Sequence, residues 1–188
     1  REEAVRKIEA ELPEGRKLKP GKIYLIVGGS MGAGNICGLV RELDRQSDRE
    51  DNILVISGSN RQIYDKLQKE YQREGKVQIL GWTDKMPLFL HAADVLFTKP
   101  GGLTSTEAAT AGCPMVHIDP IPGCETANMS YFVRHGYSIT AKTSEGQAAA
   151  GIRLAHDDSM RERMRENQRR DFKGDTSQKI LQFIEKCR

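Results

Sequence analysis

Short apolar runs alternate along the chain with longer segments in which apolar residues recur every three or four positions. The short runs predict strands that are buried on both faces, because they are continuously apolar rather than alternating. These runs are 23–27, 53–56, 77–80, 94–97, 114–118 and a last one near 137–139. The segments between them, such as 35–46, 61–73 and a short one ending at His91, predict helices. Six repeats of strand, loop and helix predict an α/β fold, with a Rossmann-like parallel sheet of about six strands and helices on both faces.

From Thr143 onward the pattern changes to helices alone, and three amphipathic segments with plausible caps follow at 144–155, 158–172 and 175–187. We therefore expect a helical C-terminal extension. The middle segment is rich in arginine, at Arg161, Arg163, Arg165, Arg169 and Arg170. This pattern favours a solvated or docking face, with a membrane surface or an acidic partner as the alternative.

The chain divides into three parts on this basis. Residues 1–22 mix acids, bases, prolines and glycines, which predicts a short surface helix over 1–12 followed by a linker. Residues 23–156 form the sheet domain, and residues 157–188 form helices that pack on it or back toward a missing part. Because the first residue is Arg1 rather than Met, we expect that an N-terminal domain precedes this chain.

Composition and charge narrow the function classes. The chain has 188 residues, of which 38% are hydrophobic and 29% charged, as in ordinary globular proteins. A net charge of +3 is too small to indicate nucleic acid, but it suits anionic small ligands. The four cysteines show no metal-binding spacing, so we expect free thiols and no metal site. There is no apolar run of membrane-spanning length and no secretory signal.

The stretch from Phe97 to Asn128 organises the rest of the chain. An apolar run ends in Lys99-Pro100-Gly101-Gly102, and an alanine-rich helical segment begins soon afterward. A strand, a glycine turn and a helix N-terminus direct backbone N–H groups and the positive end of a helix dipole at one point. This junction therefore predicts an anion-binding site.

A second loop follows the next apolar run. Asp119-Pro120-Ile121-Pro122-Gly123-Cys124-Glu125 is a stiff, proline-rich segment that opens another helix. In open α/β sheets, ligands bind at the carboxyl ends of the strands. Two neighbouring strand ends with polar loops therefore predict a ligand site at this edge.

The glycine-rich loop Gly28-Gly29-Ser30-Met31-Gly32-Ala33-Gly34 follows the first strand. It lacks the terminal Gly-Lys-Ser/Thr of a P-loop, which excludes that type of phosphoryl transfer. It also lacks the third glycine of a dinucleotide fingerprint, and the second strand ends in Ser57 rather than in an acid, which argues against a nicotinamide cofactor. Two alternatives remain: a phosphate site made by Ser30 and the bare N–H groups, or a tight turn without a ligand.

Glu107 has two interpretations. Thr104-Ser105-Thr106-Glu107 matches a capping box, in which Thr104 and Glu107 satisfy each other's backbone donors. The carboxylate could instead accept two hydrogen bonds from a vicinal diol, as a ribose offers. Sequence alone favours the cap. His91 and His117 are expected to be packing or surface residues, Cys124 an incidental thiol, and no Ser-His-Asp set indicates a hydrolase.

Four motifs in order make the pattern specific. They are Gly28-Gly29-Ser30-x-Gly32-Ala33, Gly81-Trp82-Thr83-Asp84 with Met86, Lys99-Pro100-Gly101-Gly102-x-Thr104-x-x-Glu107-Ala108, and Pro120-Ile121-Pro122-Gly123-x-Glu125-x-x-Asn128. Over about residues 24–140, the chain resembles the C-terminal, donor-binding half of GT-B glycosyltransferases. It is most similar to monogalactosyldiacylglycerol synthases and processive diacylglycerol glucosyltransferases, with the peptidoglycan lipid-intermediate N-acetylglucosaminyltransferase as a more distant relative.

The resemblance implies a UDP-hexose donor, with neither a metal nor a cofactor in the site. On this basis the backbone near Trp82 and Thr83 meets the uracil, and Glu107 holds the ribose hydroxyls. The implied diphosphate ligands are the first glycine loop (Gly29, Ser30, Gly32) and the helix start (Gly101, Gly102, Thr104, Ser105). Glu125, Cys124 and Asn128 are implied to face the sugar, although relatives commonly carry glutamine where Cys124 stands.

The implied reaction is inverting transfer of the hexose to a hydroxyl of a lipid acceptor, and the expected acceptor is diacylglycerol. The general base, the acceptor site and a peripheral contact with the cytoplasmic membrane would belong to the missing N-terminal half. This chain would therefore carry no catalytic residue and be inactive by itself. Three alternatives stay open: the donor-binding subunit of a two-chain transferase, a UDP-sugar epimerase of the same fold, and a non-catalytic nucleotide-binding module.

Overall fold

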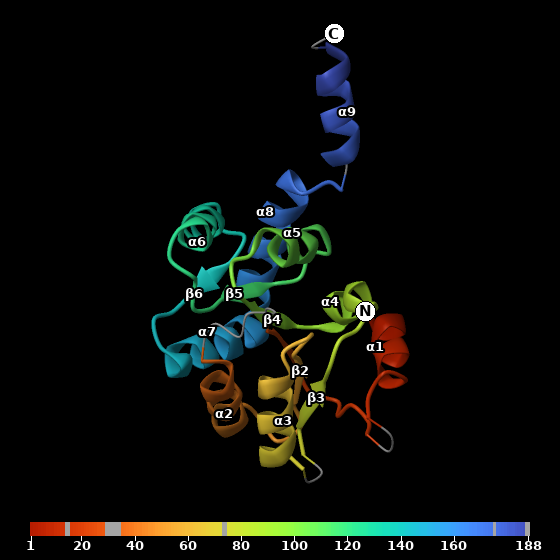
Figure 1. Cartoon of the computed structure of the whole chain (residues 1–188), viewed down its shortest axis with the longest axis vertical. Coiled ribbons are helices and arrows are strands. Elements are labelled where there is room, and N and C mark those ends of the chain that lie inside the picture. The colour runs from red at the N-terminus through yellow and green to blue at the C-terminus, as the bar shows by residue number, and fades with distance from the viewer. Residues whose placement is uncertain (14–15, 29–34, 73–74, 175, 187–188) are drawn as a thin grey trace.

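A single parallel sheet forms the centre of the molecule (Figure 1). The computed structural model describes residues 1–13, 16–28, 35–72, 75–174 and 176–186. Within them the strand order is β3-β2-β1-β4-β5-β6, and every pairing is parallel. The strands are β1 (Ile23–Val27), β2 (Asn52–Ile56), β3 (Val77–Leu80), β4 (Val95–Thr98), β5 (Met115–His117) and β6 (Ile139–Thr140). The predicted α/β fold and its six-stranded parallel sheet are confirmed.

Helices cover both faces of the sheet. They are α1 (Glu2–Glu9), α2 (Ile36–Gln46), α3 (Arg61–Glu70), α4 (Met86–Ala92), α5 (Gly102–Thr110), α6 (Cys124–Arg134), α7 (Ser144–His156), α8 (Asp158–Asp171) and α9 (Thr176–Lys186). Figure 1 shows α1, α4, α5 and α6 on one side of the sheet and α2, α3 and α7 on the other.

The core has two layers because successive side chains of each strand point to opposite faces. In β1, Leu25 packs into the cluster under α1, α4, α5 and α6, whereas Tyr24 and Ile26 pack into the cluster under α2, α3 and α7. All five residues of β1 are buried. This double burial explains why the strands are continuously apolar in the sequence.

Polar side chains begin several of the helices, as the sequence predicts. The side chain of Asn35 accepts a hydrogen bond from Gly38 N at the start of α2. Thr143 caps α7 and Asp157 caps α8 in the same way. The last strand differs from the prediction: it begins at Ile139, because Tyr137 and Ser138 still belong to the buried connection after α6.

Helix α1 is not a simple surface helix. Ile8 is fully buried and Leu12 nearly so, and both belong to the core layer that includes Phe89 of α4. The Arg1 guanidinium pairs with the Asp94 carboxylate, with 2.5 Å between the two groups. The sequence-based prediction missed this packing because the apolar positions of α1 are few and lie between charges.

The arginines of α8 do not share one environment. Arg161 is buried, and its guanidinium donates to the carbonyl oxygens of Leu154 and Ala155 at the end of α7. Arg165 Nε donates to Gly112 O at 3.2 Å, whereas Arg169 is exposed. The prediction of a solvated or docking face of arginines therefore does not hold for Arg161, which satisfies the last carbonyls of a helix.

Helix α9 stands clear of the rest of the molecule (Figure 1). Leu181, Phe183 and Ile184 are exposed on it, at 60%, 69% and 48%. Across the residues that the structure describes, no helix combines the length and the apolar character that crossing a membrane requires.

Candidate functional site

The loops predicted to bind a ligand follow three adjacent strands. β1 pairs with β4 and β4 with β5, so Val27, Thr98 and His117 end side by side. The strand order reverses between β1 and β4, which is the position where open α/β sheets form a ligand crevice. The candidate residues Gly29, Ser30 and Gly32 lie outside the described residues, and the described chain resumes at Asn35.

The turn between β4 and α5 leaves the start of α5 uncapped. Gly101 is the N-cap residue, in an extended conformation, and no side chain caps the helix. A Cβ atom built at Gly101 or Gly102 would meet nothing within 4 Å, so this helix start is open. Free first-turn N–H groups at an open helix start are suited to an anion.

The capping-box interpretation of Glu107 is wrong. Helix α5 starts at Gly102, so Thr104 lies inside the first turn and not at the cap. The Thr106 hydroxyl donates to Gly102 O at 2.7 Å. The Glu107 carboxylate is exposed and makes no hydrogen bond or ion pair with any part of the chain that the structure describes. It is therefore available to a ligand.

Ser105 takes part in a buried hydrogen-bonded set below the helix start. Its hydroxyl lies 3.0 Å from His117 Nε2, and the Ser138 hydroxyl lies 3.0 Å from His117 Nδ1. Burial lowers the pKa of His117 to about 4, so the ring is neutral at pH 7. His117 is thus the packing residue that the sequence predicts, and it joins α5 to the segment before β6. The Ser105 side chain points into the protein.

The loop between β5 and α6 holds a strained residue. Asp119 has φ of 32°, a left-handed conformation that side chains other than glycine rarely adopt. Its carboxylate accepts from Asn35 N at 2.8 Å and from Gln147 Nε2 at 3.0 Å. Backbone strain of this kind is typical of functional loops and needs fixed contacts to persist. Asp119 therefore connects the end of the first glycine loop to the second predicted site loop.

Helix α6 brings the three sugar-facing candidates to the same edge. Gly123, with φ of 111°, is its N-cap residue, and Cys124, which is exposed, and Glu125 form its first turn. The Asn128 Nδ2 group donates to Pro100 O at 3.0 Å. The α6 helix is thus bound directly to the turn that precedes α5.

Lys99 is a site residue that the sequence-based prediction did not include. Its Nζ lies 3.2 Å from Glu125 Oε1, and the two side chains are only 7% and 15% exposed. Ile121 N donates to Glu125 Oε2 at 2.7 Å. The position of Lys99 in the sequence could have revealed it, because this residue lies between a buried strand and a Pro-Gly-Gly turn. A charged residue there is rarely buried without a partner of opposite charge.

Two hollows share Asp84 as a lining residue. One of about 350 Å³ is lined by Trp82, Thr83 and Asp84 together with the segment after α1, and Trp82 is 75% exposed. The other, of about 900 Å³, is lined by Asp84 and Glu107 and by further residues of α4, α5 and the end of α8. The loop that carries Trp82 and Thr83 thus contributes its next residue, Asp84, to the hollow that Glu107 lines.

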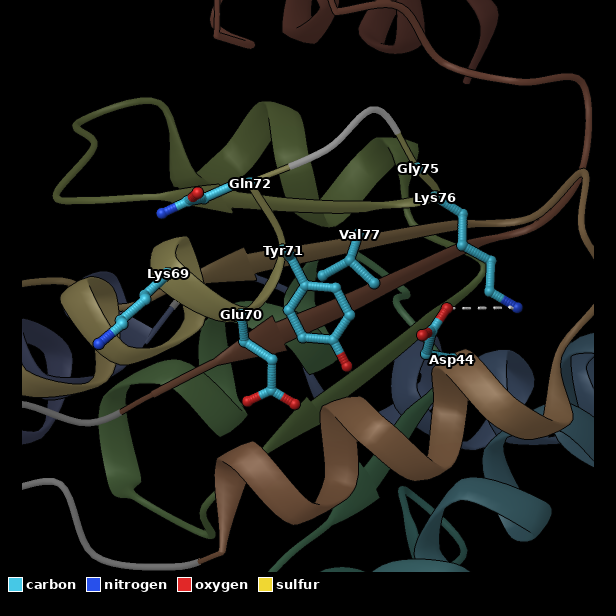
Figure 2. Close-up of a pocket in the computed structure, with 8 residues that line it drawn as sticks. All are labelled: Asp44, Lys69, Glu70, Tyr71, Gln72, Gly75, Lys76 and Val77. Carbon is cyan, nitrogen blue, oxygen red and sulfur yellow. Dashed lines mark ion pairs between the residues drawn. The ribbon is translucent and has the colours of Figure 1, made fainter.

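Another hollow, of about 360 Å³, lies at the amino-terminal end of β3 (Figure 2). Some of its charged groups already have partners, because Lys76 Nζ lies 3.8 Å from Asp44 Oδ1 and Glu70 pairs with Arg41 at 2.6 Å. Figure 2 shows Lys76 and Asp44 together on one side of the hollow and Lys69 on the other. This hollow lies at the opposite end of the strands from the predicted ligand loops.

Comparison with known proteins now identifies the fold. Residues 9–171 match the family described as "Glycosyl transferases group 1". The processive diacylglycerol beta-glucosyltransferase of Bacillus subtilis strain 168 is 28% identical over 170 residues, which are 89% of this chain and 44% of that protein. The enzyme of the same name from Staphylococcus saprophyticus is 33% identical over 130 residues, or 68% of this chain and 33% of that protein.

A solved structure superposes well on this chain. The crystal structure of Acinetobacter baumannii MurG superposes with a TM-score of 0.73 at 25% identity, over 96% of this chain and 52% of that one. The chain therefore spans about half the length of these relatives or less, and it corresponds to one domain of a two-domain GT-B fold. From the family match over most of its length, this chain belongs to the group 1 glycosyl transferases.

Proposed function

We propose that this domain binds a UDP-hexose and is the donor-binding part of an inverting glycosyltransferase that transfers the hexose to diacylglycerol. The relatives that carry the name of that activity support the class of enzyme, and they extend well beyond the part that matches this chain. The proposal for the donor rests on the geometry of the carboxyl edge.

The observation that carries the proposal is the β4–α5 turn. It combines an uncapped helix start at Gly101 and Gly102 with a carboxylate, Glu107, that has no partner among the described residues. An open helix start stabilises a diphosphate through its N–H groups and dipole. A free carboxylate one and a half turns further along accepts hydrogen bonds from the two hydroxyls of a ribose. Diphosphate and ribose are adjacent parts of one nucleotide.

The rest of the donor follows from the neighbouring loops. The uracil meets the loop of Trp82 and Thr83, whose hollow shares the lining residue Asp84 with the Glu107 hollow. The hexose meets the first turn of α6, where Cys124 and Glu125 lie. The leaving diphosphate is stabilised by N–H groups and helix dipoles, so the proposed reaction uses no metal and no cofactor.

The general base, the diacylglycerol site and the contact with the membrane surface are proposed to lie in protein outside these 188 residues. We therefore expect the chain by itself to bind the donor and to transfer nothing.

Calorimetry with UDP tests the donor assignment. We expect binding to this chain at submillimolar to millimolar UDP, and at least a ~10-fold loss of affinity in Glu107→Gln, because hydrogen bonds to a charged group contribute about 1.5–3 kcal/mol. The melting temperature should not change, since the carboxylate makes no hydrogen bond or ion pair with the described residues. Glu166→Gln, an exposed glutamate of α8, is the matched control and should bind UDP normally.

Two results would count against this function. One is the absence of heat at millimolar UDP. The other is a lowered melting temperature of Glu107→Gln with unchanged affinity, which would mean that Glu107 has a structural role after all.

A further inference from the structure

The ion pair between Lys99 and Glu125 links two of the proposed donor loops. Lys99 follows β4 directly, and Glu125 is the second residue of α6. Their charged groups lie 3.2 Å apart. The Asn128 amide adds a second link to the same turn, by donating to Pro100 O at 3.0 Å. The turn before α5 and the start of α6 are thus held together by two independent contacts.

The ion pair is largely shielded from water. The Lys99 side chain is 7% exposed and the Glu125 side chain 15%, so both are mostly buried and Glu125 keeps the larger exposed share. Removing two charges from water is costly, and a buried pair is weak evidence for a gain in stability. Because stability alone does not explain a buried ion pair at this position, we consider a role for the pair in binding the donor.

The hydrogen-bonding capacity of Glu125 is only partly used. Its Oε1 pairs with Lys99 and its Oε2 accepts from Ile121 N at 2.7 Å. An ionised carboxylate has about four acceptor sites, two on each oxygen. Glu125 is therefore held by one contact on each oxygen, and each oxygen keeps a further acceptor position.

We propose that Lys99 is a positioning residue for the hexose of the donor: it fixes the Glu125 carboxylate so that its free acceptor positions receive two hydroxyls of the sugar. This inference rests on the proposed function. Lys99 does not touch the donor itself. A carboxylate fixed in advance binds a diol better than a mobile one, because its ordering cost is met before the sugar arrives.

The test compares UDP with UDP-glucose by calorimetry, because only UDP-glucose contains the hexose. In Glu125→Gln the affinity for UDP-glucose relative to UDP should fall ~10-fold, as expected for losing hydrogen bonds to a charged group. Lys99→Met should lower the same ratio by a similar factor while the affinity for UDP itself stays unchanged. Lys99→Arg, which keeps a cation beside Glu125, should restore most of the ratio.

The double variant Lys99→Met/Glu125→Gln keeps the test decisive if Lys99→Met folds poorly. It leaves no unpaired buried charge, and its ratio should equal that of Glu125→Gln alone, because the two residues act as one unit. Lys7→Met is the matched control: Lys7 forms an exposed ion pair with Glu3 on α1, and its loss should change neither affinity.

Two outcomes would overturn this role. An equal loss of affinity for UDP and UDP-glucose in Lys99→Met would place Lys99 on the diphosphate, and an unchanged ratio would make the pair purely structural. If the unaltered chain binds no UDP at all, the proposed function itself fails. If instead UDP binds and the ratio of the two affinities is the same in Lys99→Met as in the unaltered chain, the proposed function stands and only the role of Lys99 fails.

Discussion

The buried, neutral side chain of His117, below the start of α5, makes the stability of the protein depend on pH. His117 is completely buried, and both ring nitrogens lie within hydrogen-bonding distance of serine hydroxyls. Burial lowers its pKa to about 4, compared with 6.5 for the free side chain. Between these two values the unfolded chain binds a proton that the folded protein does not, so acid favours unfolding.

We therefore expect His117 to make the protein less stable as the pH falls. Its contribution is fully present above pH 6.5 and is lost as the pH approaches 4, with a loss of about 2 kcal/mol between pH 7 and pH 5. Urea unfolding at the two pH values measures this. In His117→Gln most of that difference should vanish, whereas His91→Gln, which changes an exposed histidine, should keep it. An equal pH dependence in all three proteins would contradict the role of His117.

At this scale the sequence was a partial guide to the site. It indicated Glu107 and Glu125 as candidate ligand-binding residues, because both acids follow glycine turns at strand ends, where ligands bind in open α/β sheets. It placed the cap at Thr104, because a Thr-x-x-Glu pattern also fits a capping box; the extended backbone of Gly101, which starts the helix earlier, is set by the tertiary fold. The partner of Lys99 lies 26 positions away, and no local pattern reveals a contact at that separation.

At the scale of elements, α7 packs tightly against the sheet at Gly151. A Cβ atom at Gly151 would lie 2.1 Å from Cζ of Phe97, which is in the buried strand β4. Glycine is needed here for space, since there is no room for even a methyl group between the helix and the ring.

Gly151→Ala should therefore destabilise the protein by about 1–3 kcal/mol, the usual cost of overpacking a core. For a protein of this size, that corresponds to a melting temperature lower by roughly 2–12 °C. Gly81→Ala is the control, because a Cβ atom there would meet nothing within 4 Å. A melting temperature that rises in Gly151→Ala, as helix propensity alone would predict, would show that Phe97 can move aside.

Element types and order were predictable because the strands are buried on both faces and the helices are amphipathic. The start of α2 at Asn35 and the start of α8 after Asp157 carry recognisable caps. Helix α1 was less well predicted. Its single buried residue, Ile8, belongs to the same core cluster as Phe89 of α4, which is distant in the sequence. Periodicity shows that a helix has an apolar side, but it does not show what covers that side.

At the scale of the whole molecule, α9 is separate from the cooperative core. Its described side chains, from Leu181 to Lys186, are all exposed, and the helix extends away from the body (Figure 1). Few contacts are lost when such an element is removed.

A chain ending at Gly174 should therefore unfold at the same temperature as the full sequence, within about 2 °C, since a shift of that size corresponds to under 1 kcal/mol. Thermal unfolding followed by circular dichroism measures this, and the helical signal should fall by the share that α9 contributes. A drop of many degrees would mean that α9 packs against the body in solution.

The position of β1 in the sheet also affects how the domain assembles. β1 pairs with β2 on one side and with β4 on the other, and α2, β2, α3, β3 and α4 lie between β1 and β4 in the chain. During synthesis β1, β2 and β3 come first, and β3 ends at Leu80, before β4 begins at Val95. The crevice proposed to hold the nucleotide needs β1 together with β4 and β5, so a nascent chain has no place for the donor until the later strands have been made.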